Sequence, residues 1–145
     1  MSPRELEPDT VQAKLRLLEE LLAALDGAGP VTAERLRTDT WFRLALERML
    51  THSVDTVVAV CSHVAGAHGR TPTTYREAVA AAGELGVVEP ALASSLVAAV
   101  GMRNLLVHEY ARTDLDRVAA AVPAAAGDLR AFVRQVARWL AERTG

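Results

Sequence analysis

The spacing of apolar residues near the start of the chain has the period of an amphipathic helix. Between residues 9 and 26, apolar side chains recur at alternating intervals of four and three, which places them on one helical face. Gly27, Gly29 and Pro30 then end the pattern. The residues of this stripe are Val11, Leu15, Leu18, Leu22 and Leu25, widened by Leu17 and Leu21. The pattern predicts a first helix that is buried along much of its side.

A second apolar pattern predicts the longest helix of the chain. It starts between Thr32 and Asp39 and runs from Thr40 to about Ala65 without proline or glycine. The β-branched run between Val54 and Val64 favours a strand by propensity alone, but the length of the segment and its lack of turn residues favour a helix. Its inward positions are Leu46, Leu50, Val57, Cys61 and Val64.

Turn and capping residues divide the rest of the chain. Thr74 and Glu77 have the spacing of a capping box and open a third helix, which ends near Gly86. Pro90 stands at a favourable first position for a fourth helix. The apolar positions that this helix carries toward residue 103 are Leu92, Leu96, Val97 and Val100. We therefore expect residues 103–110 to follow directly from the fourth helix.

The last segment is expected to hold a short helix and a longer one. Thr113 and Asp114 cap a short helix through Val122, and Pro123 opens or kinks the final helix. The final stripe is Leu129, Phe132, Val136 and Leu140. The whole pattern predicts an all-α fold, an up-and-down bundle of four main helices with one or two short extra ones.

Length and composition fit one domain over residues 1–145, with residues 1–8 as a flexible lead-in that ends where Asp9 or Thr10 caps the first helix. The N-terminus lacks the pattern of a signal peptide, and charged residues interrupt each apolar stretch that could span a membrane. These features predict a soluble cytoplasmic protein.

The net charge of −2 argues against a surface coated in positive charge, so any RNA contact must be local.

The cysteine and three of the histidines carry no predicted role. Cys61 is the single cysteine and lies in an apolar run, which favours a packed thiol over a nucleophile. His52, His63 and His68 are spaced by eleven and five residues, which does not form a compact zinc site on one helical face. We therefore expect packed or solvated histidines, no metal site and no cofactor.

The candidate chemistry lies in the segment Arg103-Asn104-Leu105-Leu106-Val107-His108-Glu109-Tyr110. An arginine is a permanent cation whose planar fork suits phosphate. A histidine can take and return a proton near neutral pH. Together, Arg103 and His108 suggest phosphate chemistry, although on spacing alone an isolated Arg or His is more often a surface or core residue.

This segment, read as R-x4-H-x-Y, resembles the R-x4-6-H motif of HepT-like toxin ribonucleases of the HEPN superfamily, which belong to type VII toxin–antitoxin systems of the HepT/MntA kind. The resemblance extends from about Trp41 to Phe132. It includes a long helix ending in His-Gly, a Pro-Thr-Thr-Tyr loop, a Gly-Val-Val turn and then Gly-Met-Arg-Asn-Leu-Leu-Val-His-Glu-Tyr. Only the alanine-rich segment around Pro123 fits the pattern less well.

The resemblance implies a helical bundle and an endoribonuclease of toxin type that cleaves tRNA or mRNA. Because the sequence shows no acidic metal cluster, we expect metal-independent cleavage with the 2′-hydroxyl of the RNA as nucleophile. His108 would act as general base or acid, Arg103 would stabilise charge on the phosphate, and Asn104 would orient His108 or the phosphate. It also implies a nucleotidyltransferase antitoxin that silences the toxin by transferring AMP to Tyr110. Members of the family form two-fold dimers with the motifs facing each other.

Helical geometry limits how these residues can meet. At 100° per residue, Arg103 and His108 point roughly 140° apart, whereas Asn104 lies one turn from His108 on the same face, and Tyr110 returns to the angle of Arg103. Either the helix unwinds near Gly101, or a second subunit supplies the missing half of the site. We favour the homodimer.

Two other classes of function fit the same residues. One is a HEPN module that binds nucleotide or RNA without cutting it. The other is a plain helical interaction protein in which Arg103 and His108 are structural.

Overall fold

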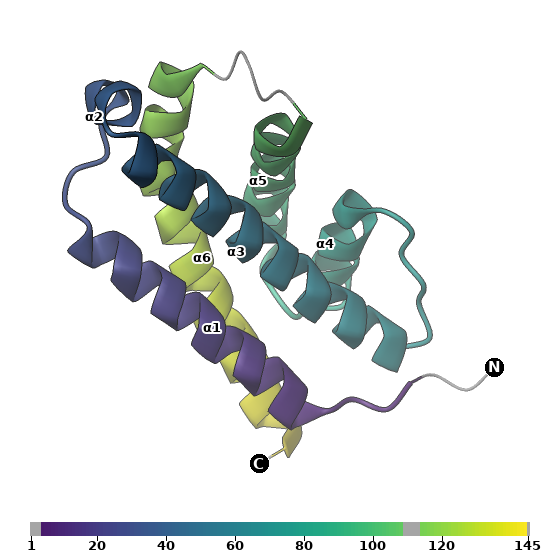
Figure 1. Cartoon of the computed structure of the whole chain (residues 1–145). Helices are drawn as coiled ribbons and strands as arrows, with labels where there is room; N and C mark the ends of the chain where they lie inside the picture. The colour runs from purple at the N-terminus through teal and green to yellow at the C-terminus, as the bar shows by residue number, and fades with distance from the viewer. Residues whose placement is uncertain (1–3, 109–113, 145) are drawn as a thin grey trace.

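A computed structural model describes residues 4–108 and 114–144 of the chain, and these residues form six helices and no strand (Figure 1). The helices are α1 Pro8–Gly27, α2 Ala33–Thr38, α3 Thr40–Ala67, α4 Tyr75–Glu84, α5 Pro90–His108 and α6 Leu115–Thr144. The four long helices are α1, α3, α5 and α6, while α2 and α4 are short. The predicted all-α bundle of four main helices with two short extra ones is confirmed.

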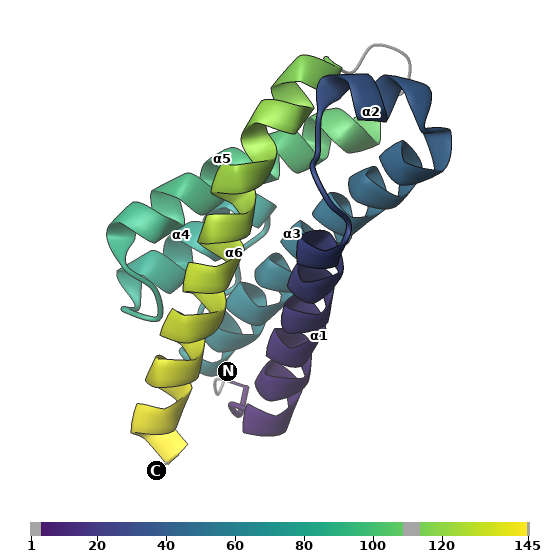
Figure 2. The same ribbon diagram turned by 90° about the vertical axis from the view of Figure 1, so that its left-hand side faces the viewer.

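The core lies between the long helices. Helix α1 packs against α3 and α6, and α5 contacts α3, α4 and α6, so the motif helix is held from three sides (Figures 1 and 2). The predicted α6 stripe is buried, including Phe132, and so is the α1 stripe as far as Leu22, whereas Leu25 is half-buried. A second apolar cluster fills the end of the bundle where α2 meets the C-terminal half of α5; its buried members are Leu36, Leu46, Leu106, Val118 and Val122.

Capping at the start of α3 and α4 follows the sequence closely. The Asp39 side chain accepts a hydrogen bond from the backbone N–H of Phe42 at 3.0 Å, and Thr74 Oγ1 accepts one from the N–H of Glu77 at 3.1 Å. Glu77 bonds back to the N–H and hydroxyl of Thr73, one residue earlier than in a standard capping box. These bonds lower the pKa of the Glu77 carboxyl. The predicted start of α4 is confirmed.

Residues 4–7, part of the predicted flexible lead-in, lie against the C-terminal part of α3. The backbone N–H of Arg4 donates to the carbonyl of Gly66 at 3.1 Å, and that of Glu7 donates to His63 Nε2 at 3.0 Å. Helix α1 begins at Pro8, with Glu7 as its N-cap, rather than after Asp9 or Thr10. A proline at the first helical position loses no intrahelical hydrogen bond, which explains the earlier start.

The prediction of two separate helices after residue 113 is wrong. Helix α6 is continuous from Leu115 to Thr144 with Pro123 inside it. A proline in a helix interior costs about 3 kcal/mol. Val122 and Ala126 are buried on either side of Pro123, so core packing of both halves offsets this cost. Asp114 caps the helix as predicted, since its side chain accepts from the N–H of Arg117 at 3.2 Å, whereas Thr113 lies outside the described residues.

The prediction about membrane-spanning stretches needs correction at α5. This helix is long and apolar enough to cross a membrane, by length and composition only, because Arg103 is the single charged residue that interrupts it. Leu92, Leu96 and Val100 of α5 are nevertheless buried in the protein core. Only 28% of the apolar window of α5 is buried, so packing against its neighbours accounts for part of this composition and leaves much of the helix uncovered by the described residues.

Candidate functional site

Arg103 is held between three helices. Its Nε donates to Asp55 Oδ1 on α3 at 3.0 Å, and its guanidinium carbon lies 4.8 Å from the centre of the Tyr75 ring at the start of α4. The side chains of Arg103 and Asp55 retain 19% and 33% of their exposure, so the ion pair is partly shielded from water. A charge-assisted bond and a stacked ring together restrict a side chain that would otherwise be flexible.

Asp55 also affects the phenol of Tyr75. Burial raises the pKa of the Tyr75 phenol, and the hydrogen bond and negative charge of Asp55 raise it further. The phenol is therefore neutral at physiological pH, and the ring beneath Arg103 carries no competing charge. The ion pair and the ring together orient the guanidinium, and a fixed orientation favours binding of a phosphate.

The side chain of Asn104 contacts Arg103, whereas that of His108 does not. Arg103 Nη1 donates to Asn104 Oδ1 at 3.2 Å. His108 is the last residue of α5 and is exposed. Within residues 4–108 and 114–144, no hydrogen bond or ion pair joins Arg103 to His108. The structure thus brings Arg103 and Asn104 together and leaves His108 on the outer face, one turn beyond Asn104.

Two arrangements could bring Arg103 and His108 together: unwinding of the helix near Gly101, or a second subunit. The continuity of α5 excludes the first. The helix runs from Pro90 to His108 without interruption at Gly101. The alternative in which the helix unwinds near Gly101 is therefore wrong. Tyr110 lies outside the described residues, so its predicted place at the angle of Arg103 stays a prediction.

Sequence reasoning missed Asp55 and Tyr75. The available signal for Asp55 was its position as the single acidic residue in the apolar run between Val54 and Val64, where a carboxylate needs a partner. Tyr75 directly follows the capping threonine of α4, and nothing in its spacing indicates Arg103. Their meeting depends on how α3, α4 and α5 pack, which local patterns do not specify.

The other candidate side chains have structural environments. Cys61 is buried, so the predicted packed thiol is confirmed, and this burial raises its pKa to about 12. His63 accepts from the N–H of Glu7, and His68 Nδ1 lies 3.0 Å from the carbonyl oxygen of Val64. Over the described ranges, no three side chains of His, Cys, Asp or Glu are grouped closely enough to hold a metal ion.

Comparison with known proteins defines the class. The sequence model of a family described as Ribonuclease HepT-like matches residues 11–136, so the chain belongs to the HepT-like family. Over 137 residues, the chain is 26% identical to a protein described as tRNA nuclease HepT from Aphanizomenon flos-aquae (strain 2012/KM1/D3). The match covers 93% of this chain and 92% of that relative.

Solved structures share the fold at low sequence identity. The cytosolic protein of unknown function YutE from Bacillus subtilis superposes with a TM-score of 0.83 at 18% identity, covering 97% of this chain and 94% of that one. A tri-AMPylated HEPN toxin from Shewanella oneidensis, solved in complex with MNT antitoxin, gives a TM-score of 0.78 at 18% identity, covering 90% of this chain and 98% of that one. These likenesses confirm the predicted HEPN-like helical fold.

A double-mutant cycle tests the ion pair at the centre of the site. We expect Asp55→Ala and Arg103→Ala to show a coupling of about 1 kcal/mol in the free energy of unfolding, because each charge is partly shielded and loses its partner. Urea unfolding of wild type, both single variants and the double variant measures it. The control is the exposed pair Arg37 and Asp116, 3.9 Å apart between α2 and α6, whose side chains retain 55% and 79% of their exposure and where we expect about 0.2 kcal/mol. Coupling at Arg103 no larger than in the control pair would contradict the description of the site.

Proposed function

We propose that this protein is the toxin of a toxin–antitoxin pair and an endoribonuclease that cleaves RNA without a metal ion. The observation that carries the proposal is the orientation of Arg103, held by Asp55 and Tyr75 on the helix that also bears Asn104 and His108. Membership of the HepT-like family and the relative described as a tRNA nuclease support the same activity.

The proposed reaction uses the chemistry of RNA itself. The 2′-oxygen attacks the neighbouring phosphorus and displaces the 5′-oxygen of the next nucleotide, which leaves a 2′,3′-cyclic phosphate and a 5′-hydroxyl end. His108 takes the proton of the 2′-hydroxyl or returns one to the departing 5′-oxygen. Arg103 stabilises the charge that develops on the phosphate oxygens, and Asn104 orients the phosphate beside it. DNA lacks the 2′-hydroxyl and is inert in this scheme.

The proposed substrate is tRNA or mRNA, and the proposed compartment is the cytoplasm. The Aphanizomenon relative is described as a tRNA nuclease, and the Bacillus neighbour as cytosolic. The net charge of −2 means that attraction to RNA must come from local groups such as Arg103 rather than from the whole surface.

We further propose that the site is completed in a homodimer. Because α5 is continuous, Arg103 faces α3 and α4 while His108 points roughly 140° away and is exposed. One straight helix therefore presents the two groups to different sides. A two-fold arrangement would place the exposed His108 of one copy near Arg103 of the other.

Silencing of the toxin is proposed to occur at Tyr110 through a nucleotidyltransferase antitoxin. The Shewanella HEPN toxin is described as tri-AMPylated and in complex with an MNT antitoxin. Tyr110 is the tyrosine of the R-x4-H-x-Y segment, so it is the residue that we assign to AMP transfer. A nucleotide there would add bulk and negative charge two residues from His108 and repel RNA.

The nuclease activity is tested with purified protein and RNA in the presence of EDTA. We expect cleavage to persist, and His108→Ala to lower its rate by about 10²–10⁴-fold with unchanged helical content, because the exposed imidazole serves chemistry and not packing. His68→Ala, which removes another exposed histidine at the far end of α3, is the control and should keep the wild-type rate. A His108→Ala rate within a few-fold of wild type refutes the assignment.

The shared site is tested by mixing two inactive variants. Dimers that combine Arg103→Ala with His108→Ala should regain one complete site and part of the RNA cleavage, whereas each variant alone stays inactive. The measurement is the cleavage rate after unfolding and refolding the mixture, beside each variant treated in the same way. A fully active monomer in analytical ultracentrifugation would exclude the shared site.

Silencing is tested with the cognate nucleotidyltransferase and ATP. We expect the intact mass to rise by AMP units, peptide mapping to place AMP on Tyr110, and RNA cleavage to fall in step. Tyr110→Phe removes the accepting hydroxyl with little change in shape and should stay active and unmodified. A Phe variant that is still modified and silenced would show that another residue accepts AMP.

A further inference from the structure

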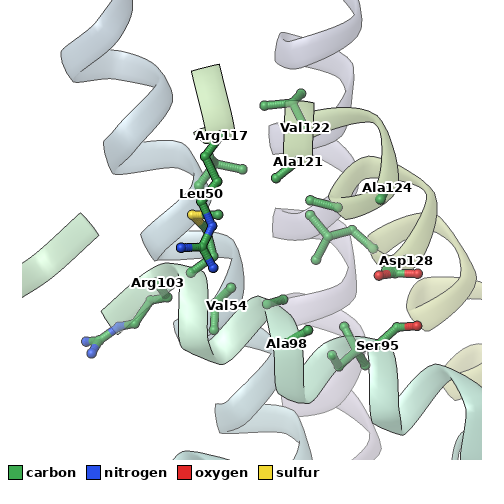
Figure 3. A pocket seen from close by; sticks show the side chains of 15 residues that line it. Leu50, Val54, Ser95, Ala98, Arg103, Arg117, Ala121, Val122, Ala124 and Asp128 are labelled. Carbon is green, nitrogen blue, oxygen red and sulfur yellow. The ribbon is translucent and has the colours of Figure 1, made fainter. Parts of the chain in front are cut away.

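A cavity of about 250 Å³ opens beside the candidate site, between α3, α5 and α6 (Figure 3). Its walls are apolar and come from all three helices; they include Leu50 and Val54 of α3, Met102 of α5, and Ala121, Val122 and Leu129 of α6. The volume is below the roughly 300–1,000 Å³ of sites for drug-sized ligands, so it suits one planar ring system rather than an extended molecule.

Arg103 links this cavity to the proposed chemistry. Its carbon stem forms part of the cavity wall, while its guanidinium reaches out of the cavity toward Asp55 and Tyr75 (Figure 3). Arg117, an exposed residue in the first turn of α6, extends along the same side of the cavity (Figure 3). Two guanidinium groups therefore mark one side of the opening.

The opposite side of the cavity carries hydrogen-bonding groups of a different kind. Ser95 of α5 and Asp128 of α6 lie there, separated from the arginines by the apolar walls (Figure 3). The cavity thus runs from a cationic side across an apolar middle to a hydroxyl and a carboxyl group. A nucleotide has the same order of parts, with its phosphate at one end, the flat faces of the base in the middle and a polar base edge at the other.

We propose that this cavity binds an unstacked nucleobase of the RNA substrate, with its phosphate beside Arg103 and Arg117 and its polar edge at Ser95 and Asp128. The choice of RNA as the source of the nucleotide rests on the nuclease function proposed above. Enzymes that act on RNA commonly hold bases that have left the stack, because only then are the faces and edges of the base accessible. The cavity becomes the part of the site that selects the base.

The chemistry of Asp128 indicates which bases fit. Its carboxylate oxygens accept hydrogen bonds from the exocyclic amine of adenine, cytosine or guanine, whereas uracil offers only its ring N3–H, flanked by two carbonyl oxygens that a carboxylate repels. Burial raises the pKa of Asp128, so this carboxyl lacks the full hydration of a surface acid. An amine donor that binds there supplies a hydrogen bond to the charged form. We therefore expect amine-bearing bases to be preferred over uracil.

The test uses four free ribonucleotides, so it does not depend on RNA cleavage. Full-length protein is titrated with AMP, CMP, GMP and UMP, and backbone amide shifts in a two-dimensional NMR spectrum report the site. We expect shifts at residues of the cavity, with UMP binding at least about five-fold more weakly than the best amine-bearing nucleotide. Asp128→Asn should reduce that difference, because the amide can donate to uracil as well as accept. Shifts confined to other surfaces, or equal affinity for all four nucleotides, overturn the proposal.

Two variants distinguish the effect of filling the cavity from a general loss of stability of the fold. Ala121→Leu puts a larger side chain into the cavity wall and should abolish the shifts, whereas Ala137→Leu, at an exposed position of α6 outside the cavity, should leave them intact. Thermal midpoints of both variants establish that they fold. Should Ala121→Leu unfold, Ala98→Leu at the exposed rim of the cavity takes its place, with the same expected loss of binding.

The outcomes distinguish this proposal from the nuclease function. Nucleotide binding in the cavity without any RNA cleavage supports the pocket and refutes the nuclease. RNA cleavage whose base preference and rate are unchanged in Ala121→Leu, with no nucleotide shifts, supports the nuclease and refutes the pocket. Loss of self-association in Ala121→Leu, without nucleotide shifts in wild type, would show that a second copy of the chain covers the cavity instead, and would also refute the proposal.

Discussion

The continuity of α5 is the constraint on which the candidate site depends. The helix is fixed from three sides by α3, α4 and α6, and its buried residues include Leu96, Val100 and Leu106 near the motif. Because of this packing, a rotation of α5 about its own axis would expose these buried apolar side chains to water. Arg103 is therefore directed inward to Asp55 and Tyr75, and His108 outward at the exposed end. In the homodimer that we propose, the two groups would come together from two copies of this face.

The contacts of Arg103 explain how a partly buried guanidinium can be held in one orientation. Asp55 occupies Nε, Asn104 accepts from Nη1, and the Tyr75 ring covers one face of the guanidinium. An arginine without these partners would sample many rotamers and would lose entropy on binding phosphate. The same contacts come at a cost, because the Asp55 carboxylate competes with an incoming phosphate for positive charge. The contacts therefore fix the orientation of the Arg103 guanidinium but lower the positive potential around it. The whole chain, with a net charge of −2, adds no positive potential of its own.

Much of the fold could be predicted from periodicity, because burial of one face dominates helices such as α1 and α3. The prediction failed where packing overrides local preference. Pro123 is accommodated inside α6 because Val122 and Ala126 are both buried, and α5 packs against three helices although only 28% of its apolar window is buried. The motif segment was found from sequence, but Asp55 and Tyr75 were not, since only the packing of α3 and α4 on α5 brings them to Arg103. The angle between Arg103 and His108 followed from helix geometry alone.

The central claim is that this site cleaves RNA through the 2′-hydroxyl of the substrate. The most direct measurement uses an RNA in which a single nucleotide, at a mapped cleavage position, carries hydrogen in place of that hydroxyl. With EDTA present, we expect the bond after this nucleotide to resist cleavage while other bonds in the same molecule are cut at their usual rates. Undiminished cleavage after the 2′-deoxynucleotide would contradict the account, because the attacking oxygen would then have to come from elsewhere.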